Sequence, residues 1–97
     1  MRHEILLAPE AARDLEKLDA HVRAAVRDAI EKHLRHQPAR TSKSRIRRLR
    51  GLARPQFRLR VGTVRVFYDV VETRVEVLAI VQKSDVKVWL ERAGERP

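Results

Sequence analysis

The sequence predicts an α+β fold, in which two N-terminal helices pack on a four-stranded, mostly antiparallel sheet and a short helix follows at the C-terminal end. Two observations lead to this fold class. Apolar residues recur at helical spacing before residue 35, and they alternate with polar residues at strand spacing after residue 55. The later strands are joined by links of two residues, which allow hairpins but no parallel crossover. We expect residues 1–97 to form a single domain.

The first expected elements are a short strand over 4–8 and two helices. Pro9 stands where the first turn of a helix tolerates proline, and Ala11, Leu15 and Leu18 follow at helical spacing. After a break near Asp19-Ala20, a second helix carries one apolar stripe and stops before Pro38. Its members are Val22, Ala25, Val26, Ala29, Ile30 and Leu34. Helices joined by so short a link lie antiparallel and together cover one face of a sheet.

Three expected strands over 56–61, 64–71 and 74–82 form a meander. Gly62-Thr63 suits a type II′ turn, which pairs Val61 with Val64. One face of this hairpin is then apolar and faces the helices; it carries Phe57, Leu59, Val61, Val64, Val66 and Tyr68. The other face carries Arg58, Arg60 and Arg65, with Arg60 directly opposite Arg65.

The remaining segments are a long connection and a last helix. Residues 41–54 are expected to be irregular and to face solvent or a ligand because of their charge. The last helix spans 84–92, with Ser84 as its candidate N-cap. Trp89 on this helix is expected to cover Phe67, Leu78 and Ile80, which would otherwise form an exposed apolar patch.

Positive charge is concentrated in one part of the chain. Residues 32–68 contain no Asp or Glu and hold twelve of the 22 Lys and Arg residues, so the other ten face 13 acidic residues and the net charge of +9 resides in this stretch. The twelve are Lys32, Arg35, Arg40, Lys43, Arg45, Arg47, Arg48, Arg50, Arg54, Arg58, Arg60 and Arg65. Such asymmetry favours a polyanionic ligand, with nucleic acid first and an acidic protein second.

The composition excludes several other classes of protein. Cysteine is absent, which excludes disulfides and thiolate metal sites and makes the reducing cytoplasm the expected location. No apolar run has the length of a membrane span or a signal peptide, so no membrane partner is expected. The four histidines are interpreted as surface residues rather than metal ligands, and neither a metal nor another cofactor is expected. They are His3, His21, His33 and His36.

The predicted arginine cluster favours phosphate binding. Like charges opposite each other destabilise a sheet by up to about 1 kcal/mol unless solvent screens them or an anion lies between them. Guanidinium groups suit bidentate phosphate contacts, although a solvated outer face is the alternative interpretation. A second set of basic residues flanks the cluster and would bind RNA through charge alone. This set comprises Lys43, Arg45, Arg47, Arg48, Arg50 and Arg54.

Four segments carry a resemblance to a known family: 49–52 (LRGL), 56–62 (QFRLRVG), 64–70 (VRVFYDV) and 75–80 (VEVLAI). With them the chain resembles the RelE/ParE superfamily of type II toxin–antitoxin toxins over nearly its whole length. The resemblance implies a RelE-like, microbial-RNase-like fold and a cognate antitoxin as partner. For the RelE branch it also implies cleavage of messenger RNA on the ribosome, with Arg58, Arg60, Arg65 and Lys83 as candidate catalytic residues.

One departure from the RelE branch concerns the chemistry. That branch ends in a basic cluster and a tyrosine, whereas this chain has Trp89, which has no ionisable proton and cannot act as a general acid or base. Three functions therefore remain open. They are a ribosome-dependent mRNA endonuclease, a gyrase inhibitor of the ParE branch, and a module that only binds its antitoxin.

Overall fold

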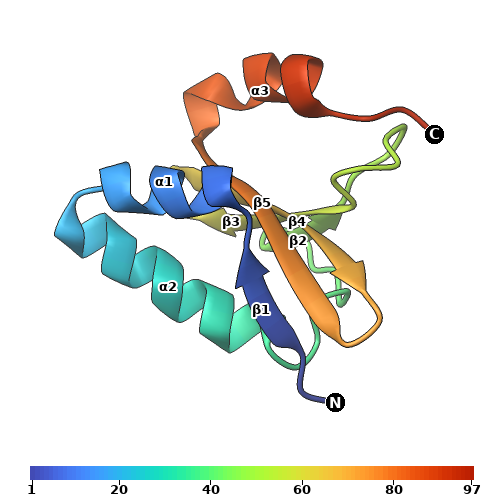
Figure 1. Ribbon diagram of the computed structural model, residues 1–97, viewed down its shortest axis with the longest axis horizontal. Coiled ribbons are helices and arrows are strands. Elements are labelled where there is room, and N and C mark those ends of the chain that lie inside the picture. The colour runs from blue at the N-terminus through green and yellow to red at the C-terminus, as the bar shows by residue number, and fades with distance from the viewer.

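The computed structural model describes residues 1–97 as a five-stranded sheet with strand order β1-β5-β4-β3-β2 and three α-helices (Figure 1). The helices are α1 (Pro9–Lys17), α2 (Ala20–Leu34) and α3 (Val86–Ala93), and a 3-10 turn, η1 (Lys83–Asp85), precedes α3. The strands are β1 (Glu4–Leu7), β2 (Ile46–Arg48), β3 (Phe57–Val61), β4 (Val64–Val71) and β5 (Arg74–Gln82). The α+β class predicted from sequence is confirmed, and β1 pairs with β5 in parallel. No helix is both long and apolar enough to cross a membrane.

The β3–β4 hairpin has the predicted register. Val61 lies opposite Val64, Arg60 opposite Arg65, and Arg58 opposite Phe67. Gly62 has a φ of +59°, while Thr63 is not in the positive-φ region, which matches a type II′ turn with glycine at its first central position. The register places every second residue of both strands on the same face of the sheet.

The predicted count of four strands is wrong, because Ile46–Arg48 in the supposedly irregular connection pairs with β3 as a fifth strand. Its apolar content is a single residue, Ile46, which is buried opposite Leu59. An edge strand needs no alternating apolar pattern, and charged residues on it discourage pairing with other chains. Because arginines dominate this segment, it lacks the alternating apolar pattern by which a strand is predicted from sequence.

The main core lies between the helices and one face of the sheet. Figure 1 shows α1 and α2 side by side next to the sheet, with α3 apart from α2. The predicted core face is confirmed, since Phe57, Leu59, Val66 and Tyr68 are at most 3% exposed and pack in one cluster with residues of both helices. The helix residues of that cluster are Ala11, Leu15, Val26, Ile30 and Leu34.

A smaller cluster lies on the opposite face under α3. Trp89 stacks on Phe67 with ring centroids 4.8 Å apart, as predicted, but its other buried neighbours are Ala79 and Val81 rather than Leu78 and Ile80. A β-bulge explains the correction: Phe67 pairs with Ala79 and Tyr68 with Val77, so one residue of β5 has no partner. Beyond the bulge the two faces of β5 exchange residues, and Ile80 joins the main core.

The start of the last helix also differs from the prediction. Ser84 lies inside the 3-10 turn, and Asp85 precedes α3 without a side-chain cap. The Lys83 backbone N–H donates to the Thr63 carbonyl at 2.7 Å, so this turn continues the pairing of β5 with the end of the β3–β4 hairpin. Because α3 begins at Val86, its N-cap position is occupied by Asp85 rather than by Ser84.

Candidate functional site

Four arginines from three adjacent strands lie on one end of the sheet face opposite the main core, and we call this region the Arg face. Arg47 on β2 lies opposite Arg58 on β3, and Arg60 on β3 lies opposite Arg65 on β4. Directly opposite residues point to the same side of a sheet. The structure thus brings together the three predicted cluster residues and adds Arg47, which sequence reasoning assigned to the flanking set because β2 was not recognised.

Arg65 is the most buried member of the Arg face. It is 7% exposed, and its Nη1 donates to the carbonyls of Gly62 at 2.8 Å and Val64 at 3.1 Å. These contacts hold the β3–β4 turn. Burial, together with the charge of Arg60, lowers the pKa of Arg65. Arg65 is therefore first a structural part of the hairpin, and its replacement would alter the turn as well as the charge.

Arg58 and Arg60 are better placed to meet a ligand. The Arg60 side chain is exposed and has no partner within the chain, while Arg58 is half-buried and reaches the Ser44 carbonyl at 3.3 Å through Nη2 only. The buried Nε of Arg58 has no hydrogen-bond partner. Burial and the charges of Arg65, Arg47 and Arg60 lower the pKa of Arg58. An anion at this position would relieve the repulsion between these groups.

Carboxylates on the same face lie at its other end. Along β4 the order is Arg65, Phe67, Asp69, so the Phe67–Trp89 stack separates the Arg face from Asp69 and from Glu76, its partner on β5. Because four residues of a strand span about 13 Å, these acids do not neutralise the Arg face.

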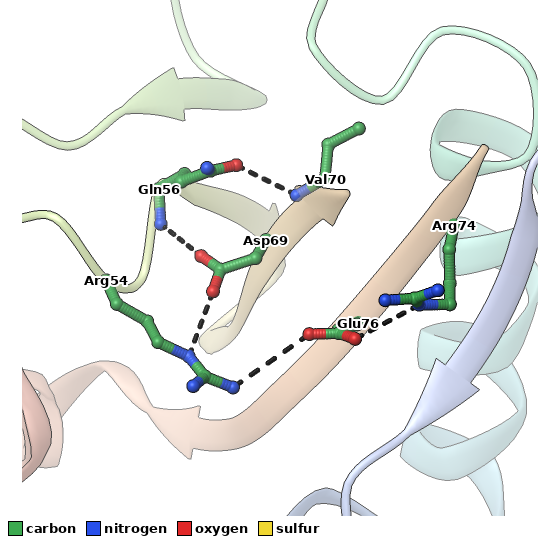
Figure 2. Close-up of polar contacts among 6 residues, drawn as sticks. All are labelled: Arg54, Gln56, Asp69, Val70, Arg74 and Glu76. Atoms are coloured by element: carbon green, nitrogen blue, oxygen red, sulfur yellow. Dashed lines mark hydrogen bonds and ion pairs between the residues drawn. The ribbon is translucent and has the colours of Figure 1, made fainter. Parts of the chain in front are cut away.

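Arg54 belongs to this acidic end rather than to the Arg face. Figure 2 shows its guanidinium group between the two acids: Nε lies 3.0 Å from Asp69 Oδ2, and Nη2 lies 4.0 Å from Glu76. Asp69 also accepts from the Gln56 backbone N–H at 2.7 Å. Burial is the main cause that raises the pKa of Asp69. The charge of Arg54, a member of the predicted RNA-binding set, is thus balanced inside the molecule.

The other predicted binding residues surround the Arg face at the open edge and at the hairpin end. Lys43, Arg45 and Arg50 are exposed in the connection around β2, and Arg48 lies over the Phe57 ring with its Cζ 5.1 Å from the centroid. Lys83, the fourth candidate catalytic residue, is exposed beside Thr63 at the turn. These placements leave most of the set available to solvent.

The Arg face offers charge but no group suited to proton transfer. Arginine is a donor that stays protonated at neutral pH. Tyr68 is fully buried in the main core, as predicted, and its hydroxyl donates to the Pro38 carbonyl at 2.6 Å. Burial raises the pKa of Tyr68. This arrangement can bind a phosphate and stabilise negative charge that develops on it.

Comparison with protein families gives one match: the model of the ParE toxin of type II toxin–antitoxin system, parDE, matches residues 5–86. Comparison with curated proteins gives no match.

Solved structures share the fold. The E. coli toxin RelE, in a mutant form in the free state, has a TM-score of 0.70 at 20% identity and covers 96% of this chain and 99% of its own. One chain of the RelBE2 toxin–antitoxin complex from Mycobacterium tuberculosis has a TM-score of 0.64 at 29% identity, covering 84% of this chain and 99% of that one. One chain of the RelB–RelE complex from Methanococcus jannaschii has a TM-score of 0.64 at 19% identity, covering 87% and 96%.

The fold is therefore RelE-like. The match to the ParE toxin model places the protein in the class of toxins of type II toxin–antitoxin systems. Since the ParE toxin model spans most of the chain, the chain belongs to that family, within the RelE/ParE superfamily that the sequence resembles.

Proposed function

We propose that this toxin is a ribosome-dependent mRNA endonuclease that inhibits translation, and that its Arg face holds the scissile phosphate. The observation that supports this best is the uncompensated pair of Arg58 and Arg60, which have no carboxylate near them on the Arg face. Guanidinium groups match phosphate oxygens in geometry and charge. In this proposal the protein acts in the cytoplasm, where messenger RNA and ribosomes occur together.

The residues of the Arg face would have different roles in cleavage. Attack of a ribose 2′-hydroxyl on the neighbouring phosphorus builds negative charge on the phosphate oxygens, and Arg60, with Arg58 beside it, would stabilise that charge. Arg65 would hold the turn that positions Arg60, and Lys83 would add charge at the hairpin end. The new bond would close a 2′,3′-cyclic phosphate as the P–O5′ bond breaks. The 2′-hydroxyl would give its proton to water or to the ribosome, and the leaving 5′-oxygen would take a proton from the same source, while the chain would supply charge and position.

Replacement of Arg60 tests this role more cleanly than replacement of Arg65, because the Arg60 side chain makes no hydrogen bond or ion pair within the chain. Arg60→Ala should reduce message cleavage on the order of a hundredfold. Arg27→Ala, which removes an exposed arginine of α2, should leave cleavage unchanged. Primer extension on a reporter message after induction measures both. Equal cleavage by wild type and Arg60→Ala would remove Arg60 from the mechanism.

A gyrase inhibitor is the second candidate function. Two observations favour it: the matching family model is that of ParE toxins, and the Arg face has no side chain suited to proton transfer. A supercoiling assay with DNA gyrase, run beside primer extension, separates the two functions. Intact message together with inhibited supercoiling would reject the endonuclease, and neither effect would leave a module that only binds its antitoxin.

We also propose a cognate antitoxin as partner. The complexes from M. tuberculosis and M. jannaschii each contain an antitoxin with the toxin. An acidic or amphipathic antitoxin segment laid across the basic surface would complement the charge of residues 32–68. Co-purification of this chain with the product of a neighbouring gene tests this expectation.

A further inference from the structure

A second cationic site lies outside the Arg face, in a pocket between the C-terminal end of α2 and the loop over residues 37–46. We call it the α2 pocket. Its volume is about 350 Å³, and the residues lining it include five nitrogen bases and no carboxylate. These bases are Lys32, His33, His36, Arg40 and Arg45. Without a counter-charge from the protein, such a pocket attracts an anion.

The loop that closes the α2 pocket is held by specific contacts. Ser42 Oγ accepts from the backbone N–H groups of Arg45 at 3.0 Å and Ile46 at 3.2 Å, and the Ser42 N–H donates to the Ile46 carbonyl. At the other end of the loop, the Pro38 carbonyl accepts from the buried Tyr68 hydroxyl. The pocket walls are therefore tied both to β2 and to the main core.

One contact in the pocket sets the charge of a histidine. Arg45 Nη1 lies 3.0 Å from His33 Nε2, and because arginine only donates, this nitrogen must be the acceptor of a neutral imidazole with its proton on Nδ1. Burial, with the charges of Arg45 and Lys32, lowers the pKa of His33. The cations of the pocket thus favour the neutral form of His33.

Cations at the end of a helix often do no more than complement the helix dipole. That explanation covers Lys32, which lies in the last turn of α2. It leaves out Arg40 and Arg45, because both come from the loop after the helix. Two elements therefore supply charge to the same cavity.

Arg45 connects the α2 pocket to the Arg face. The Arg60 backbone N–H donates to the Arg45 carbonyl at 2.8 Å, and a second surface depression is lined by both residues together with Ser44 and Gly62. Basic side chains therefore continue from Arg60 around the β2 edge of the sheet to the end of α2. A strand of nucleic acid carries phosphates at the regular intervals that such a path requires.

We propose that the α2 pocket is a second phosphate subsite, which holds a backbone phosphate of the same single-stranded RNA that lies on the Arg face; this rests on the proposed function, in which RNA is the ligand. An acidic peptide fits less well. The only apolar residue lining the pocket is Ile46, which is itself 4% exposed, so an amphipathic segment would find no apolar surface there.

The test uses the full chain and a 2′-O-methyl RNA octanucleotide, which cannot be cut by 2′-hydroxyl attack, so binding is measured independently of cleavage. The pocket variant combines Lys32→Ala and Arg40→Ala, two exposed residues. The matched control combines Arg13→Ala and Arg27→Ala, which removes the same charge from exposed positions of α1 and α2 outside the pocket. Fluorescence anisotropy gives Kd as a function of salt.

We expect the pocket variant to bind the octanucleotide on the order of fivefold more weakly than wild type, with the slope of log Kd against log salt reduced by about 0.7 for each lost phosphate contact. The control should keep most of the wild-type affinity and slope. If the pocket variant and the control bind equally, the subsite is rejected, even where wild type cuts message. Weakened binding by the pocket variant with no cleavage by wild type would keep the subsite and reject the endonuclease.

Two further measurements separate other ligands of the same charge. Inorganic phosphate, titrated while the backbone amide signals of Ser42 and Arg45 are followed by NMR, should not saturate the pocket at micromolar concentration. If micromolar phosphate saturates the pocket and the pocket variant keeps its octanucleotide affinity, the α2 pocket is a site for free phosphate and the inference is overturned. Loss of antitoxin affinity without loss of octanucleotide affinity would assign the pocket to the antitoxin and overturn it equally.

Discussion

Individual arginines in the basic stretch differ in what their guanidinium groups contact. Arg65 is engaged with two turn carbonyls, Arg54 with two carboxylates, and Arg45 with a neutral histidine, whereas Arg60 has no partner within the chain. Only the last of these can meet a ligand without giving up a contact within the chain. The number of charged residues in the sequence therefore indicates the electrostatic field around the protein. The contacts in the folded structure decide which of these residues can bind a ligand.

At the scale of the residue, we predict that His33 makes stability depend on pH. Its folded-state pKa is lowered, so the unfolded chain binds more protons as pH falls, and the contribution of His33 is present above its unfolded pKa of about 6.5 and is lost below it. Relative to His33→Gln, which keeps an acceptor for Arg45, wild type should lose free energy of unfolding between pH 7.5 and 5. Urea titrations at each pH measure this difference.

The reference for this experiment is Arg45→Ala, which removes one of the cations that disfavour a charged His33. In that background the effect of His33→Gln should depend less on pH. A stability difference between wild type and the His33→Gln variant that stays constant from pH 7.5 to 5 would contradict the neutral state assigned to this imidazole.

At the scale of the element, the two hairpin turns adopt the same positive-φ backbone conformation with different residues. Gly62 begins the β3–β4 turn with a φ of +59°, and Glu72 takes the corresponding place in the β4–β5 turn with a φ of 57°. Glycine adopts this left-handed region freely, whereas a residue with a Cβ is strained there by about 1–2 kcal/mol. The second hairpin is thus the less favourable of the two locally.

We therefore predict that Glu72→Gly stabilises the protein. Relief of strain exceeds the added entropy of the unfolded chain, which leaves a net gain of about 0.5–1 kcal/mol in the free energy of unfolding. Chemical denaturation measures it. Glu72→Ala serves as the control, because it removes the charge but keeps the strain. An equal gain from both variants would show that the charge of Glu72, and not its backbone, limits stability.

At the scale of the whole molecule, the sheet separates two kinds of surface. The two N-terminal helices cover one face with the main core, and on the other face the Phe67–Trp89 stack divides the Arg face from the acids paired with Arg54. The net charge of +9 is therefore presented mainly at the β2 edge and the hairpin end. Partners with negative charge should approach from there.

This charge distribution leads to a prediction about the proposed antitoxin complex. Its affinity should fall as ionic strength rises from about 0.05 to 0.5 M, because the Debye length shortens from above 10 Å to below 5 Å and screens the attraction. Isothermal titration calorimetry over this range measures the change. An affinity independent of salt would indicate an interface dominated by apolar contacts.

The sequence by itself determined the three helices, four of the five strands, the β3–β4 register and the separation of apolar and basic faces. These features depend on residues close together in the chain: helical spacing, alternation along a strand, and a two-residue turn with glycine in its first place. The resemblance to the RelE/ParE superfamily also rested on such local segments, and the comparisons confirm it.

Only the tertiary structure decided the fifth strand, the bulge in β5, the pairing of Arg54 with Asp69 and the α2 pocket. Each of these depends on groups that are distant in sequence. The Ile80 N–H, for instance, lies beyond the parallel β1–β5 pairing, which ends at Val77, and it donates to Asp14 at 2.9 Å and 66 positions away. Local patterns show which residues prefer a helix or a strand. They do not show which charged group or backbone donor meets which partner, because the folded chain brings those partners together from distant positions in the sequence.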